Sequence, residues 1–238
     1  MKGEREVLVF EDAAKMSQAI IGRWKDIANA AIAQRGYFSL VLSGGKTPLD
    51  LYRRISSIPG DEIPWQKTHI FFIDERDVPL QHPNSNLDML ARELFEKVNI
   101  PKENVYAVFG GSLRAEEAAA AYAEKIKRFF KLEGSELPVF DLILLGLGAD
   151  GHTAALFPLD LGRLDKEERL AVKAEAQDAK EPWVTLTLPV INSAANVFML
   201  VTGGHKAEIL KKILEENADV PAAHVRPKDT KVIFWVDK

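Results

Sequence analysis

The chain has 238 residues, 47% of them hydrophobic and 28% charged, which is the balance of a globular protein with a sizeable core. Its net charge of −4 at pH 7 argues against a broad surface for nucleic acid, and the absence of cysteine excludes disulfides, thiolate nucleophiles and cysteine-ligated metals. No apolar run approaches the roughly 18 residues that span a membrane, and no signal region follows Met1, so we expect a cytoplasmic protein.

Segments typical of strands and helices alternate along the chain. In order, we expect a strand at 6–10, a helix at 13–34, a strand at 37–42, a helix at 47–58, a strand at 69–73, helices at 84–98 and 114–131, strands at 140–145, 183–188 and 197–201, a helix at 205–215 and a strand at 231–236. The charged, weakly patterned region 159–182 is expected to be a surface excursion or a lid. The alternation predicts one α/β domain over 1–238, with a mainly parallel sheet between two layers of helices in a three-layer αβα, Rossmann-like arrangement.

A glycine-containing turn, Ser43-Gly-Gly-Lys-Thr-Pro48, joins the strand at 37–42 to the helix at 47–58. Glycines let the backbone approach a ligand closely, and a helix N-terminus offers free N–H groups and partial positive charge. These features predict a phosphate cradle formed by Ser43, Gly44, Gly45, Lys46 and Thr47. The alternative is a tight turn with Thr47 as the helix cap, and this segment alone leaves both open.

The strand at 69–73 ends in the polar run Asp74-Glu-Arg-Asp77, and Asn84-Ser-Asn86 follows shortly after. Arg76 suits a bidentate contact with phosphate, and Asp74 could orient a sugar hydroxyl or a catalytic group. Asn86 is a further candidate for substrate binding. The alternatives are a solvated ion-pair cluster at 74–76 and a helix-capping role for Asn86.

Lys206 follows the strand at 197–201 and should lie in the first turn of a helix. A cation there opposes the helix dipole, at a cost of about a few tenths of a kcal/mol. A bound anion would turn this lysine into a second phosphate contact. The alternative is an exposed lysine that tolerates the cost.

The run Gly146-Leu-Gly-Ala-Asp-Gly-His-Thr153 follows the apolar strand at 140–145 and presents Asp150 and His152 in a turn. Polar groups beyond the carboxyl end of a buried strand are where open α/β sheets bind ligands. Histidine titrates near neutrality and suits a general base. A structural histidine, held by hydrogen bonds in the turn, is the alternative. The other histidines in the sequence show no metal-ligand spacing.

These segments, in this order, resemble those of the 6-phosphogluconolactonase family. The matching stretches are 43–48, 74–76 with 85–86, 146–158, 185–192 continuing to 203–206, and 221–227. The most specific of them is Asp150-Gly-His-Thr-Ala-Ala-Leu-Phe-Pro158. This sequence departs from the family pattern at Trp183, where an arginine is common, at Leu87, where an aromatic residue is usual, and at Ala149, which replaces a common proline.

The resemblance implies a sugar-phosphate-isomerase-like fold. It also implies metal-free, cofactor-free hydrolysis of 6-phospho-D-glucono-1,5-lactone to 6-phospho-D-gluconate, in the oxidative branch of the pentose phosphate pathway. In this family pattern, His152 is the catalytic base, and Arg76 and Lys206 bind the substrate's phosphate. Gly151 is expected in the substrate site, and either Asp150 or Asp74 to orient the base or the water. The expected partner is the small-molecule lactone, with no nucleic acid and no membrane, in a monomer or small homo-oligomer.

Two other functions stay open at this point. A glucosamine-6-phosphate deaminase or isomerase shares the glycine turn, but its histidine is typically followed by an Ile-(Ala/Gly)-Phe-Asn-Glu-Pro-like run. Here residues 153–158 read Thr-Ala-Ala-Leu-Phe-Pro. A sugar-phosphate-binding regulator on the same fold would need an added DNA-binding segment or a lost base, whereas His152 is present.

Overall fold

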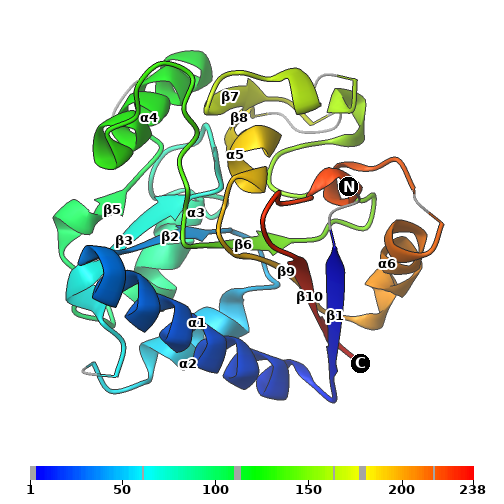
Figure 1. The fold of residues 1–238 in the computed structure, drawn as a ribbon, viewed down its shortest axis with the longest axis horizontal. Helices are drawn as coiled ribbons and strands as arrows, with labels where there is room; N and C mark the ends of the chain where they lie inside the picture. Colours follow the sequence, from blue (N-terminus) through cyan, green and yellow to red (C-terminus); the bar gives the residue numbers. More distant parts are fainter. Residues whose placement is uncertain (1–3, 61, 110–113, 163, 177–180, 217) are drawn as a thin grey trace.

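The structure, a computed structural model, describes residues 4–60, 62–109, 114–162, 164–176, 181–216 and 218–238. Its centre is a seven-stranded sheet in the order β1-β10-β9-β6-β2-β3-β5, and its neighbouring strands run parallel (Figure 1). The strands are β1 (Arg5–Phe10), β2 (Phe38–Leu42), β3 (Thr68–Phe72), β5 (Val105–Tyr106), β6 (Leu142–Gly146), β9 (Val197–Val201) and β10 (Val232–Asp237). The prediction of a mainly parallel sheet is confirmed.

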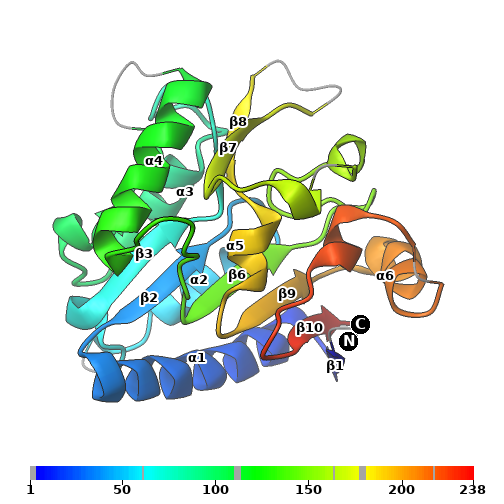
Figure 2. The ribbon, with the colours of Figure 1, turned by 45° about the horizontal axis from the view of Figure 1, so that its top comes forward.

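Helices cover both faces of this sheet, and Figure 2 shows α1 below it and α4 and α5 above it. The helices are α1 (Ala13–Arg35), α2 (Leu49–Ser56), α3 (Asn86–Leu90), α4 (Ala115–Phe130), α5 (Leu188–Asn192) and α6 (Ala207–Leu214). A π-helical turn spans Ala91–Phe95, and 3-10 turns span Trp65–Lys67, Lys102–Asn104, Pro158–Asp160, Leu164–Lys166, Gly204–Lys206 and Pro221–His224. This arrangement confirms the three predicted layers. None of the helices in the described part of the chain is long and apolar enough to cross a membrane.

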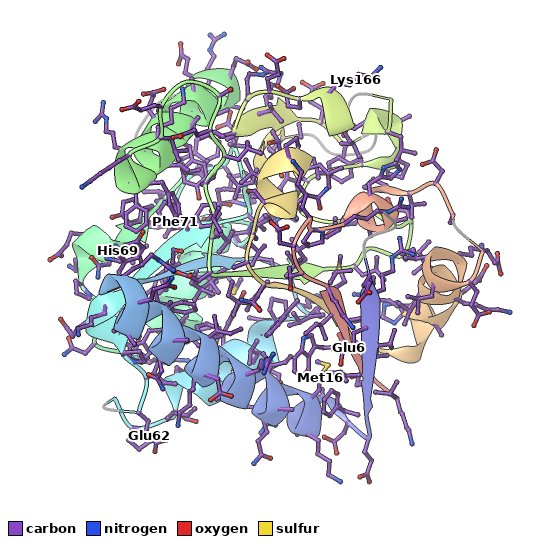
Figure 3. All side chains as sticks on the ribbon, viewed as in Figure 1. Glu6, Met16, Glu62, His69, Phe71 and Lys166 are labelled. Atoms are coloured by element: carbon purple, nitrogen blue, oxygen red, sulfur yellow. The ribbon has the colours of Figure 1, made fainter. Side chains whose placement is uncertain are left out.

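The first helix shows why the sequence folds in this way. Asp12 caps the start of α1 by accepting a hydrogen bond from the Lys15 backbone N–H at 2.7 Å, and Gly36 ends the helix. Its inner face buries Met16, labelled in Figure 3, and Trp24. Strand β2 is buried along its whole length, because helices cover both sides of the sheet.

A second, smaller sheet lies beside the large one. It is antiparallel, in the order β4 (Asp74–Arg76), β8 (Trp183–Leu186), β7 (Ala171–Ala174). The sequence predicted the strand at 183–188 but missed β4 and β7, and it described 159–182 as a surface excursion or a lid. This region instead supplies strand β7, while its residues 163 and 177–180 lie outside the described residues. The pairing sets Trp183 directly opposite Arg76.

Three predicted helices differ at their ends. Helix α2 begins at Leu49, two residues later than predicted, and Thr47 does not cap it. The helix predicted at 84–98 is α3, capped by the Ser85 hydroxyl and continued by the π-helical turn. The helix predicted at 205–215 starts as a 3-10 turn before α6 begins.

The amino-terminal part of β3 lies in an aromatic cluster. His69 and Phe71, both labelled in Figure 3, pack there with Tyr106 and Phe129. The rings of Phe71 and Tyr106 stack with centroids 4.3 Å apart, and those of His69 and Phe129 lie 4.8 Å apart. Aromatic pairs of this kind add about 0.5–1.5 kcal/mol to area burial. His69 therefore has a packing role, at the end of the strand opposite to the site described next.

Candidate active site

The strands β2 and β6 are neighbours at the point where the strand order of the large sheet reverses. The chain continues from β2 to β3 on one side, and from β6 to β9 on the other. Open α/β sheets bind ligands at such a point, outside the carboxyl ends of the strands. A cavity of about 210 Å³ lies there. It is lined by Ser43, Gly44, Gly45, Lys46, Thr47, Asp74, Arg76, Asn86, Gly146, Leu147, Gly148, His152, Ala154, Trp183 and Lys206.

All but two of the site residues predicted from sequence line this cavity. The two exceptions are Asp150 and Gly151. Asp150 lies behind His152 and bonds to its ring, as described below. Gly151 contacts the C-terminal segment and not the cavity: its carbonyl accepts a hydrogen bond from the Ala222 backbone N–H at 3.0 Å. The C-terminal segment around Ala222 thereby supports the turn that carries His152.

Close contact between Gly44 and Asn86 shapes the turn after β2. A Cβ atom on Gly44 would lie 1.8 Å from Asn86 Oδ1, so only glycine permits this approach. The Asn86 Nδ2 group donates to the backbone oxygen of Asp74 at 2.9 Å. Asn86 therefore joins the turns that follow β2 and β3, and it is not a helix cap. Beside it, the buried hydroxyl of Ser43 has no hydrogen-bond partner in the described part of the chain.

Lys206 is buried, with 9% of its surface exposed, which rules out the exposed-lysine alternative. Its Nζ donates to Thr47 Oγ1 at 3.1 Å, and this bond joins the loop after β9 to the turn after β2. Burial lowers the pKa of Lys206, and the charge of Asp237 acts in the opposite direction. Among the described residues, no carboxylate forms a salt bridge with this ammonium group. An anion in the cavity would compensate its charge.

The run 74–76 is not a solvated ion-pair cluster, because Asp74 and Glu75 are only 7% and 4% exposed. The Glu75 carboxylate accepts hydrogen bonds from the backbone N–H groups of Arg76, Asn86 and Leu87 and from the Ser85 hydroxyl, at 2.7–3.2 Å. Burial raises the pKa of Glu75, and these hydrogen bonds oppose the rise. Glu75 thus fixes the start of α3 and the position of Asn86 in the cavity wall.

The guanidinium of Arg76 lies over the Trp183 ring, with Cζ 3.8 Å from the centre of the indole ring. Its Nη1 donates to the backbone oxygen of Asn84 at 2.8 Å. Burial lowers the pKa of Arg76, while the charges of Asp74 and Glu75 raise it. No carboxylate in the described ranges forms a salt bridge with this guanidinium. Its remaining N–H donors are therefore available to a bidentate acceptor such as phosphate.

Asp74, a titratable residue, lines the cavity together with Arg76. Burial, together with the charge of Glu75, raises its pKa to about 7, although the charge of Arg76 acts to lower it. Asn86 Nδ2 lies 3.3 Å from its Oδ1. Asp74 lines the cavity on the β3 side, whereas His152 enters from the β6 side.

His152 and Asp150 form a pair in the turn after β6. Nδ1 of His152 lies 2.6 Å from Asp150 Oδ1, and the same oxygen accepts from the His152 backbone N–H at 3.1 Å. Partial burial acts to raise the pKa of Asp150, but these hydrogen bonds and the attraction of His152 lower it overall. A Cβ on Gly148 would lie 2.2 Å from His152 Nδ1 and 2.6 Å from Asp150 Oδ1, so glycine is required for the pair to pack there.

Thr153 joins this turn to the end of β6. It is fully buried, and its hydroxyl donates to the backbone oxygen of Gly146 at 2.8 Å, at the end of β6. The turn closes on itself as Gly148 N–H donates to the His152 oxygen at 2.8 Å. The carboxylate on Nδ1 selects the tautomer in which Nε2 is free to accept a proton.

Five lining residues were not among the predicted site residues, namely Gly146, Leu147, Gly148, Ala154 and Trp183. The first four lie within a few residues of His152 in the sequence, and this proximity could have identified them. Trp183 had no such local signal. Its place in the cavity depends on the antiparallel pairing of β8 with β4, two segments more than a hundred residues apart.

A profile of the family described as glucosamine-6-phosphate isomerases/6-phosphogluconolactonase matches residues 11–235. A 6-phosphogluconolactonase of Synechocystis sp. is 38% identical over 209 residues, which cover 87% of this chain and 84% of that protein. The crystal structure of 6-phosphogluconolactonase from Thermotoga maritima has 31% identity and a TM-score of 0.85, covering 99% of this chain and 100% of that one. A monomeric glucosamine-6-phosphate deaminase, with 20% identity and a TM-score of 0.80 over 98% of this chain and 97% of that one, shares the fold. The chain belongs to the glucosamine-6-phosphate isomerase/6-phosphogluconolactonase family.

Proposed function

We propose that the chain hydrolyses 6-phospho-D-glucono-1,5-lactone to 6-phospho-D-gluconate, the activity for which its relatives are named. The observation that carries this proposal is a pair of cations, Lys206 and Arg76, that line one cavity with His152. In the described part of the chain, neither cation has a carboxylate salt bridge. Such a pair suits a phosphate group, and a histidine paired with a carboxylate suits the activation of water.

The phosphate would be held by Arg76, by Lys206 and by the backbone of the turn 43–47. Thr47, already bonded to Lys206, and the unpaired hydroxyl of Ser43 offer further polar contacts. Binding energy from the phosphate then fixes the lactone carbonyl near His152, which lowers the entropic part of the barrier.

In the chemical step, Nε2 of His152 takes a proton from water, and the water oxygen forms a bond to C1 of the lactone. Backbone N–H groups of the glycine turns stabilise the tetrahedral oxyanion. The C1–ring oxygen bond then breaks, and the imidazolium returns the proton to the departing oxygen. The products are the carboxylic acid, which ionises, and a free hydroxyl at C5.

The two acidic residues receive different roles in this proposal. Asp150 orients the base, because it lies 2.6 Å from His152 Nδ1. Asp74 lines the opposite wall and is joined to Asn86, which suits the orientation of a sugar hydroxyl. The sequence left open which acid orients the base, and the 2.6 Å distance supports Asp150 for this role.

The test is a side-by-side assay of freshly prepared 6-phosphogluconolactone and of glucosamine 6-phosphate, with the spontaneous hydrolysis of the lactone subtracted. We expect acceleration of lactone hydrolysis that saturates with substrate, and no turnover of glucosamine 6-phosphate. Turnover of the amino sugar instead would favour a deaminase. Acceleration of neither reaction would overturn the proposal and favour a sugar-phosphate-binding protein.

A further inference from the structure

We propose that Trp183 is a positioning residue, which holds the guanidinium of Arg76 in the orientation that binds phosphate. This inference rests on the proposed function for the identity of the substrate, but the contact itself does not. Cζ of Arg76 lies over the Trp183 ring, 3.8 Å from its centre, which is the distance of a guanidinium stacked on an indole face. The quadrupole of the indole ring attracts a cation placed over its face, and the attraction is stronger when the pair is desolvated.

The backbone pairing of β4 with β8 places Arg76 next to Trp183. Arg76 and Trp183 are directly opposed partners in the antiparallel pair of β4 and β8, and opposed residues point to the same face of a sheet. The pairing continues one step further, since the backbone N–H of Asp77 donates to the Pro182 oxygen at 2.8 Å. Trp183 therefore reaches Arg76 from a short and well-fixed strand.

The stack limits how Arg76 can bind an anion. One face of the guanidinium is covered by the indole, and Nη1 is engaged with the Asn84 oxygen at 2.8 Å. Phosphate binds through the edge of a guanidinium in a planar, two-pronged contact. A stacked arginine already presents this edge in a fixed direction. It therefore loses less conformational entropy on binding phosphate than a free side chain does.

The same indole connects the phosphate side of the cavity with the base. Phe157 packs edge-on against Trp183, with ring centroids 6.5 Å apart, and its ring lies 5.4 Å from that of His152. A continuous row of rings thus runs from Arg76 to His152.

The test compares Trp183→Leu with Trp183→Phe, and it measures the Kd of 6-phosphogluconate and of inorganic phosphate. Removing the ring face should raise both Kd values about 5- to 30-fold, the range that corresponds to the energy of a partly desolvated cation–π contact. Trp183→Phe keeps a ring face and should stay within about threefold of the wild type. Trp235→Phe, which replaces an indole on β10 outside the cavity, is the control for loss of a tryptophan and should leave both Kd values unchanged.

A double-mutant cycle separates positioning from a general role in the cavity wall. If Trp183 acts through Arg76, Trp183→Leu should change the Kd of phosphate by less than about twofold in an Arg76→Ala background. An equal loss in both backgrounds would overturn the proposal, as would an unchanged Kd in Trp183→Leu alone.

The stack also has a signature that needs no substrate. In the ligand-free protein, the ring current of the indole should move the Hδ proton resonances of Arg76 upfield, and Trp183→Leu should abolish this shift. Absence of the shift in the wild type would overturn the proposed contact. If the shift and the phosphate effects are present while the lactone is not hydrolysed, the positioning role stands and only the proposed function fails.

Discussion

Oδ1 of Asp150 lies 2.6 Å from Nδ1 of His152, and both residues belong to the turn that follows β6. In the proposed mechanism, the carboxylate fixes the imidazole tautomer and stabilises the imidazolium that forms during proton transfer. We expect Asp150→Ala to lower kcat at least about tenfold with little change in KM. Steady-state kinetics on the lactone would test this. Asp26→Ala, which removes an exposed carboxylate on α1 outside the cavity, is the matched control and should leave kcat unchanged.

Gly148→Ala should impair the site without unfolding the protein. The new Cβ would lie 2.2 Å from His152 Nδ1, so the imidazole must move, and a displacement of about 1 Å can cost about a hundredfold in rate. We therefore expect a large fall in kcat with an unchanged far-ultraviolet circular dichroism spectrum. Gly22→Ala, within α1 and with nothing within 4 Å of the added atom, should keep full activity. Equal activity in both variants would contradict the packing described for Gly148.

Lys206→Met should weaken substrate binding without lowering the stability of the protein. Removing the cation that is proposed to bind the phosphate should raise KM at least about tenfold. Removing a buried charge without a counter-ion should not lower the free energy of unfolding, since its desolvation is unfavourable in the empty protein. Urea titration and kinetics on the same preparation would show both effects. Lys211→Met, an exposed lysine on α6, is the control, and an unchanged KM in Lys206→Met would contradict the assigned role.

Asp74→Asn should change how stability depends on pH. The folded-state pKa of Asp74 is raised to about 7 by burial, so the folded protein retains a proton that the unfolded chain releases near pH 4. Wild-type stability therefore falls as pH rises through this window, by up to about 4 kcal/mol for this group. The melting temperature of Asp74→Asn relative to wild type should rise from pH 4 to pH 8. A difference that stays constant with pH would contradict the raised pKa.

The sequence predicted those parts of the site that depend on local order. The turn 43–47, Arg76, His152 and Lys206 each follow the carboxyl end of a strand, and parallel strands bring these ends to one edge of the sheet. The apolar run of β6 was also predicted from the sequence. That the chain forms one domain stays a prediction.

The remaining parts depend on contacts between distant segments. Strand β4 is only Asp-Glu-Arg, and β7 is Ala-Val-Lys-Ala, so neither carries the apolar run that marks a strand. The antiparallel sheet and the stack of Arg76 on Trp183 were therefore missed. Burial of Glu75 was missed for a similar reason, because its partners at 85–87 become neighbours only when α3 folds back on β4.

In the proposed mechanism, His152 activates water, while Arg76 and Lys206, in other parts of the cavity wall, bind the phosphate. The most direct test is to measure kcat for lactone hydrolysis and the Kd of 6-phosphogluconate in His152→Asn, beside His205→Asn as a control outside the cavity. General base catalysis contributes about 10²- to 10⁴-fold, so kcat of His152→Asn should fall by that factor while the Kd stays within about threefold of wild type. Hydrolysis of the lactone by His152→Asn at nearly the wild-type rate would rule out His152 as the general base.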